Sequence, residues 1–148
     1  MIVAEGLLPH LRRARDRIDR EYALPLDLVA LADTAGLSRF HFLRCFAAAY
    51  GRTPAHYLAE RRMERAQDLL RSTNLTVTEI CVLVGYSSLG SFSSRFSALV
   101  GTSPSAYQAR WARTGAPRIP GCYVFMHGLS DRTSSTPATR PASRSGPS

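Results

Sequence analysis

Apolar residues recur at helical spacing through most of the first 113 residues of the chain. In the first stretch, from about Leu7 to Glu21, the residues Leu8, Leu11 and Ile18 return to one side of a helix. No segment shows the strict alternation of apolar and polar residues that a half-buried strand requires. The pattern therefore predicts an all-α fold. The helix boundaries described next divide it into about seven helices.

Residues that start and end helices divide the rest of this region. Ser, Thr and Asp are favoured N-caps, and proline is favoured in a first turn. Glycine suits the left-handed residue that closes a helix, and Thr followed three residues later by Glu makes a capping box. These signals predict six further helices: between Asp27 and Gly36, from Ser38 to about Tyr50, from Pro54 to about Ser72, from Thr76 to Gly85, from Ser87 or Ser88 to Gly101, and from Ser103 to about Arg113.

Part of this region occurs twice. Residues 32–57 can be laid over residues 81–107, with one extra residue in the turn of the second copy. The matched residues are Gly36 with Gly85, Phe42 with Phe92, Phe46 with Phe96, Gly51 with Gly101, Thr53-Pro54 with Ser103-Pro104, and Tyr57 with Tyr107. Each copy is a short helix, a tight turn with glycine and a second helix, which is the helix-turn-helix pattern.

The repeat predicts two helix-turn-helix units, at about residues 27–50 and 76–100, joined by a linking helix at about 54–72. In this motif the second helix lies in the major groove of DNA, and its N-terminal residues meet base edges. The linking helix is about 30 Å long at its usual rise, which suits two grooves about 34 Å apart. A helical bundle that was duplicated without binding DNA is the competing interpretation.

The charge of the chain favours the first interpretation. The net charge is +8, and every basic residue is Arg. Residues 38–71 hold seven arginines against three carboxylates, whereas residues 1–37 hold five against six. A basic balance points to nucleic acid or to an anionic membrane surface as a partner. A bundle without a nucleic-acid partner has no need for this basic middle.

Nothing in the chain is typical of a signal peptide or a membrane span, which needs about 18 apolar residues. The three cysteines, Cys45, Cys81 and Cys122, are odd in number and form no CxxC pair. We therefore expect a cytoplasmic protein without membrane contact, in which Cys45 and Cys81 are small core residues.

The segments LVALADTAGLSRFHFLRCF, GRTPAHYLAERRMERAQDLL, TVTEICVLVGYSSLGSFSSRF and GTSPSAY resemble, in this order, the AraC/XylS-type DNA-binding domain. The resemblance covers about residues 8–112. It implies seven helices, two helix-turn-helix units and binding to an extended, asymmetric promoter site. The chain is similar to the short members of that family, which consist of little beyond this domain. We expect a transcriptional regulator that binds double-stranded promoter or operator DNA as a monomer, with RNA polymerase as a further candidate partner and no cofactor or metal.

The paired phenylalanines indicate which faces of the two recognition helices are outward. With Phe42 and Phe46 inward at about 100° per residue, and Phe92 and Phe96 likewise, the opposite faces carry the candidate base contacts. These are Phe40, Leu43, Arg44 and Ala47 in the first unit, and Gly90, Ser93, Ser94 and Ser97 in the second, with Leu89 as an ambiguous neighbour.

The two faces differ in chemistry. Arg44 can bind guanine O6 and N7 in a bidentate manner, and Phe40, Leu43 and Ala47 can meet thymine methyl groups. The second face offers only hydroxyls and glycine. The family pattern often has Arg at the position of Ser94, but here the arginine is one place later, at Arg95, about 100° away.

Candidate phosphate contacts are basic side chains near the recognition helices and residues at helix N-termini, whose N–H groups favour anions. For Arg39, Arg52 and Arg71, simple solvated charge is the alternative, and for Arg95 an acid within the protein. We expect mainly structural roles for Arg61, Arg62 and Arg65 on the linking helix. The candidates are Ser38, Arg39, Arg52, Thr53, Arg71, Ser88, Arg95 and Ser103.

Other classes of function find little support in the residues. GxSxG, HExxH and phosphate-binding glycine loops are missing, so we expect no enzymatic activity. His41, Cys45 and Cys81 do not show the spacing of a metal site. A nonspecific nucleic-acid-binding protein or an adaptor of the helical-bundle type remains the alternative function.

The composition changes after Arg113. Of residues 130–148, twelve are Ser, Thr or Pro, and such a segment buries too little apolar surface to become ordered. We therefore expect residues 114–148 to be a mostly disordered, low-complexity tail that folding and most DNA affinity do not require. The short apolar segment from Cys122 to Met126 either packs on the domain or forms a brief strand.

Overall fold

The computed structural model describes residues 3–113, and this part of the chain contains helices and no strand. The expected tail at 114–148, including the segment from Cys122 to Met126, lies outside the described residues. The predicted all-α fold with seven α-helices is confirmed, and a short 3₁₀ helix, η1, was not predicted. The elements are η1 (Glu5–Leu7), α1 (Leu8–Glu21), α2 (Leu28–Ala35), α3 (Arg39–Tyr50), α4 (Pro54–Ser72), α5 (Val77–Leu83), α6 (Leu89–Val100) and α7 (Pro104–Ala112).

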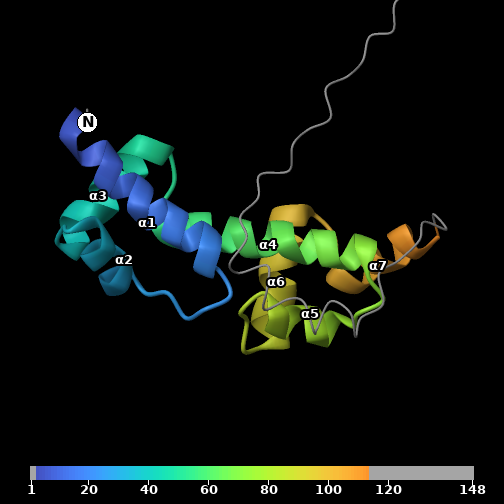
Figure 1. Ribbon diagram of the computed structural model, residues 1–148. Coiled ribbons are helices and arrows are strands. Elements are labelled where there is room, and N and C mark those ends of the chain that lie inside the picture. Colours follow the sequence, from blue (N-terminus) through green and yellow to red (C-terminus); the bar gives the residue numbers. More distant parts are fainter. Residues whose placement is uncertain (1–2, 114–148) are drawn as a thin grey trace, which may run out of the picture.

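The helices form two units, and α4 runs through both of them (Figure 1). The helices α1 and α3 pack against the beginning of α4 and α2 packs on both of them, while α5, α6 and α7 pack against the rest of α4. Each unit has a core of its own. The first contains Phe42 and Phe46 with Leu58 of α4, and the second contains Phe92 and Phe96 with Met63 of α4.

The predicted caps are present at nearly every helix end. Asp27 accepts a hydrogen bond from the amide of Ala30, and Thr76 and Glu79 form the predicted capping box. Ser88, rather than Ser87, caps α6. Gly36, Gly51, Gly85 and Gly101 all have positive φ values, as expected for residues that close a helix. These local signals explain why the helix bounds follow so closely from the sequence.

The linking helix α4 does more than join the two units. Leu11, Ala14 and Ile18 of α1 are buried in the first core, and Met63, Ala66 and Leu70 of α4 are buried at the same spacing in the second. The second half of α4 therefore packs in the second unit as α1 packs in the first. The structural repeat is thus longer than the repeat found in the sequence, which began after α1.

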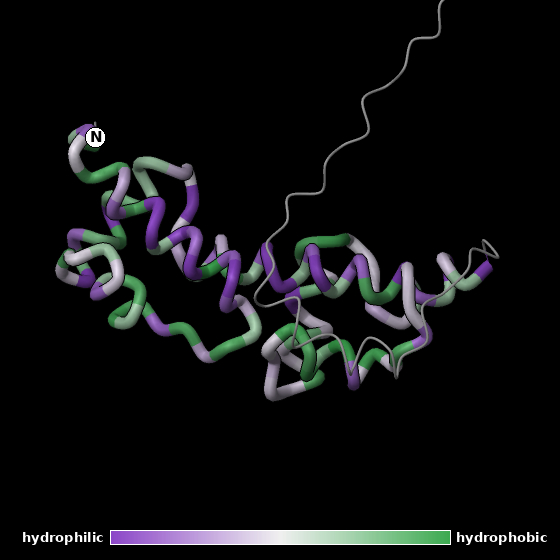
Figure 2. The backbone as a smooth tube through the Cα atoms, viewed as in Figure 1, coloured by the Kyte–Doolittle hydropathy of each residue, from purple (hydrophilic) through white to green (hydrophobic). Residues whose placement is uncertain are grey.

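Hydrophilic and apolar residues alternate along α1 and α4 (Figure 2). This is the pattern of amphipathic helices that bury one face. Among residues 3–113, no helix is both long and apolar enough to cross a bilayer.

Two matched glycines differ in what surrounds them, which leads to a prediction about stability. Gly36 and Gly85 have φ values of 69° and 95°, and a Cβ on Gly36 would meet nothing within 4 Å. A Cβ on Gly85 would lie only 2.8 Å from the carbonyl oxygen and 2.9 Å from the Cα of Ala23, in the α1–α2 connection.

We expect Gly36→Ala to lower the free energy of unfolding by about 1–2 kcal/mol, the usual effect of a left-handed non-glycine residue. Gly85→Ala should lower it further, because the backbone at Ala23 cannot move aside as a flexible side chain would. Urea unfolding of both variants and the parent measures the difference. An equal decrease in the free energy of unfolding for the two variants would show that the close approach of Gly85 to Ala23 does not add to the cost of a side chain there.

Candidate nucleic-acid interface

The first unit has the geometry of a helix-turn-helix. Gly36 closes α2, the amide of Leu37 donates to the carbonyl of Ala32 at 3.0 Å, and Ser38 caps α3. Phe42 and Phe46 are fully buried, with ring centroids 5.6 Å apart. The inward face predicted for α3 is therefore confirmed, and the helix is held against its own core by these two rings.

The outward face of α3 divides into exposed and half-buried residues. Phe40 is 65% exposed, and Arg44 is exposed on the next turn. Leu43 and Ala47 are half-buried, so they form the flank of this face rather than its centre. Ala48, which the sequence analysis did not single out, is exposed as well.

Arg44 differs from most of the arginines around it. Within residues 3–113 it has no ion pair, hydrogen bond or ring contact, whereas Arg39 stacks on Phe40 at 4.9 Å and Arg52 pairs with Glu60. Its guanidinium therefore keeps all its donors for a ligand. An exposed aromatic ring and a free guanidinium one turn apart make this face suited to base edges and phosphates.

The second unit repeats this geometry with different side chains. Phe92 and Phe96 are fully buried, with ring centroids 5.9 Å apart, which confirms the inward face of α6. Outward, the first turns of α6 present small and hydroxyl residues. Gly90, Ser94 and Ser97 are exposed, Ser93 is half-buried and Leu89 is 45% exposed.

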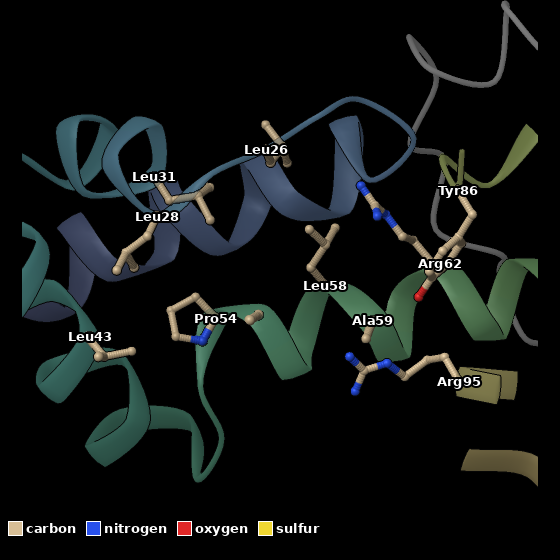
Figure 3. A pocket seen from close by; sticks show the side chains of 11 residues that line it. Leu26, Leu28, Leu31, Leu43, Pro54, Leu58, Ala59, Arg62, Tyr86 and Arg95 are labelled. Carbon is tan, nitrogen blue, oxygen red and sulfur yellow. The ribbon is translucent and has the colours of Figure 1, made fainter. Parts of the chain in front are cut away.

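Arg95 occupies the position in α6 that Cys45 occupies in α3. Cys45 is buried in the first core, but Arg95 is exposed and lies beside Tyr86 at the end of a groove between the two units (Figure 3). The groove has a volume of about 280 Å³ and runs along α4, with Leu43 of α3 at its other end. Arg95 therefore lies at the edge of the outward face: it lines the end of this groove on one side and a shallow hollow with Ser91 and Ser94 on the other.

The side chains around Tyr86 affect its ionisation. Burial raises the pKa of the Tyr86 hydroxyl, while the positive charges of Arg62 and Arg95 and hydrogen bonds with them work in the opposite direction. Burial also lowers the pKa of Arg62, with Tyr86 partly opposing the change. Arg95 thus lies near Tyr86, and within residues 3–113 it forms no ion pair with an acidic side chain, which is the within-protein role that the sequence left open for it.

The remaining phosphate candidates differ in their freedom to meet a ligand. The caps Ser38, Thr53, Ser88 and Ser103 are exposed, and the hydroxyl of each already accepts a hydrogen bond from an amide of its own helix. The free N–H groups of these first turns remain available to an anion. Arg71 pairs with Asp68 and lies over Trp111 at 5.7 Å, so it joins α4 to α7.

A polar network joins α1 to α4 in the first unit. Arg61 pairs with Asp19 at 2.9 Å and with Glu64 at 2.8 Å, and Tyr57 donates to Asp19 at 2.9 Å. Burial, and then the hydrogen bond to Asp19, raise the pKa of Tyr57 to about 12. Burial alone would lower the pKa of Arg61, but the negative charges of Asp19 and Glu64 have the larger effect, so its pKa is raised. The structural role predicted for Arg61 is confirmed.

The cysteines lie in separate places. Cys45 is buried in the first core and Cys81 in the second, as predicted for small core residues. Burial raises the pKa of the Cys81 thiol, which keeps it protonated. In the part of the chain that the structure describes, no three His, Cys, Asp or Glu side chains are placed to hold a metal ion.

Comparison with known proteins agrees with this geometry. A family model described as a helix-turn-helix domain matches residues 31–110. The MmsAB operon regulatory protein of Pseudomonas aeruginosa is 40% identical over 85 residues, which are 57% of this chain and 28% of that protein. The chain spans between 27% and 62% of the length of the first four curated relatives it matches.

Solved structures share the fold. The C-terminal domain of AraT, a response regulator from Geobacillus stearothermophilus, has a TM-score of 0.67 and 34% identity, covering 70% of this chain and 87% of that one. The DNA-binding domain of AdpA, a global transcriptional factor solved in complex with a target DNA, has a TM-score of 0.63 and 27% identity. That match covers 76% of this chain and 97% of the AdpA domain.

Proposed function

The chain belongs to the AraC-type helix-turn-helix family, and on this basis we propose that it regulates transcription by binding double-stranded DNA sequence-specifically. The recognition helices α3 and α6 enter successive major grooves, and the promoter or operator is the ligand. The relatives that carry the comparison are regulators by name and not enzymes.

One observation carries the proposal: the second helix of each unit turns its two phenylalanines inward and leaves its opposite face open to solvent. Phe40 and Arg44 in α3, and Gly90 and Ser94 in α6, occupy those open faces. The helix α4, with 19 residues, is about 28 Å long, and this length supports a placement of the two faces in neighbouring grooves about 34 Å apart.

The partners follow from the same proposal. We assign base contacts to the exposed members of the two faces, Phe40 and Arg44 first, and phosphate contacts to the first turns of the capped helices. The DNA-bound form is a monomer, since two recognition helices in one chain already span two grooves. Contact with RNA polymerase and action in the cytoplasm are parts of the same proposal, in line with the bacterial regulators among the relatives.

Selection of bound sequences from a random duplex pool tests the function. We expect the full chain to enrich a site with two conserved parts about one helical turn apart. Affinity for that site and for a scrambled duplex is then measured at the same salt concentration. A ratio of about 10³ or more is typical of specific binding. Equal affinities at every salt concentration would instead establish the alternative, a nonspecific nucleic-acid-binding protein.

A further inference from the structure

The two cores of the protein are separate, so something other than a shared core must fix the angle between the units. The first core ends on α4 at Leu58, and the second begins at Met63. Arg62 lies at this boundary and is partly buried. It is therefore placed where a side chain can contact both units at once.

Arg62 connects three segments. Its Nε donates to the carbonyl of Tyr22 at 2.6 Å and its Nη2 to the carbonyl of Leu24 at 3.0 Å, both in the α1–α2 connection of the first unit. Its guanidinium also lies 5.3 Å from the ring centre of Tyr86, in the turn of the second unit. Figure 3 shows the side chain extending from α4 toward that connection, with Tyr86 beside it.

The same connection contacts the second unit directly. The backbone of Ala23 lies so close to Gly85 that a Cβ there would be 2.8 Å from the Ala23 oxygen. Tyr86 continues the contact inward, because its ring packs on Phe92 of α6 at 5.6 Å. The residue that matches Gly85 in the first unit, Gly36, has no neighbour within 4 Å of its Cβ position. The close contact with Ala23 therefore occurs only at the turn of the second helix-turn-helix unit, and the helix-turn-helix motif as such does not require it.

We propose that Arg62, Gly85 and Tyr86 form a joint that fixes α6 relative to α3, and thereby sets the spacing between the two parts of the DNA site. The proposal rests on the proposed function and names the residues that position the second recognition helix. A rigid joint presents both helices in register before binding, so the second contact follows the first at a high effective concentration. Arg62 is a positioning residue and does not itself touch DNA.

The spacing of selected sites tests this joint. The full chain and the variant Arg62→Ala are each used to select from a duplex pool in which two parts of the parental site are separated by random lengths. For the variant, we expect the same base preferences in each part, a broader distribution of spacings, and a loss on the order of tenfold in affinity for the parental site. Affinity for a duplex with only the first part should not change.

Arg61→Ala is the matched control, because Arg61 is the neighbouring arginine on α4 and its ion pairs, with Asp19 of α1 and Glu64 of its own helix, do not involve the turn of the second unit. It should keep the parental spacing. Tyr86→Leu is a second variant, since Leu37 matches Tyr86 in the first repeat and leucine can still pack on Phe92. If Arg62→Ala fails to fold, Tyr86→Leu carries the test. A folded variant that selects the parental spacing as narrowly as the parent would overturn the proposal.

A measurement without DNA separates the joint from the proposed function. Nitrogen-15 relaxation of the full-length protein reports how each unit tumbles. The parent should tumble as one body, while Arg62→Ala should give the two units different rotational correlation times. A parent that selects no site at all would contradict the proposed function, and relaxation would then decide the joint alone. One common correlation time in a folded Arg62→Ala variant would show that α4 alone holds the two units in a fixed orientation, and would contradict the role of the joint.

Discussion

Arg44→Ala is expected to remove the preference for guanine at one position of the DNA site and to leave the other positions unchanged. Arg44 is exposed on the outward face of α3, opposite the buried Phe42 and Phe46, and its guanidinium is free of partners within residues 3–113. A bidentate arginine–guanine contact contributes about 1–3 kcal/mol of discrimination. The affinity for the selected site should therefore fall by between about fivefold and 150-fold.

The measurement is a comparison of selected-site profiles and of affinities for matched and mismatched duplexes at one salt concentration. Arg12→Ala is the control, because Arg12 is an exposed arginine on α1 and the change removes the same charge outside both recognition helices. Nonspecific affinity should fall little in either variant. A profile for Arg44→Ala that keeps every preference of the parent would show that Arg44 meets a phosphate or solvent.

The parts of the fold that sequence predicted are those governed by neighbouring residues. A cap such as Thr76 and a closing glycine such as Gly51 act within one turn, so residue type and spacing suffice to place them. The inward rings were predictable for the same reason, since helical periodicity alone puts Phe42 and Phe46 on one side. The 3₁₀ helix at Glu5–Leu7 has no side-chain cap and carried no comparable signal.

Contacts between distant segments were not predictable from the sequence. Periodicity placed Leu43 and Arg44 alike on the outward face, but Leu43 is half-buried and lines the groove beside α4. The partner of Arg71 in α7 and the approach of Ala23 to Gly85 depend on the packing of whole units. One signal was available: the repeat aligns Arg95 with the core residue Cys45, which indicates that Arg95 lies away from the centre of the outward face of α6.

The last prediction concerns the half of the DNA site that α6 contacts. This half should show weaker base preferences than the half that α3 contacts. Gly90, Ser94 and Ser97 are the exposed residues of the outward face of α6, and none has a side chain with two parallel donors. Arg95 lies about 100° around the helix from Ser94, at the end of the groove beside Tyr86, so we expect it to meet a phosphate rather than a base. Phosphate contacts and the shape of the groove can still hold α6 in place, so affinity need not fall in proportion.

Ser94→Arg should therefore sharpen the weak half, because residue 94 matches Arg44 of α3 in the repeat and is exposed near the start of α6. The expected gain is a new guanine preference of about 1–3 kcal/mol, or between fivefold and 150-fold over the other bases at one position. Ala98→Arg is the matched control: it adds the same charge one turn later, farther from the residues that meet bases, and should raise affinity without changing the profile. If the parent already selects two equally sharp halves, Leu89 or Arg95 must read bases, and α6 must lie in the groove rotated away from the orientation that Phe92 and Phe96 impose.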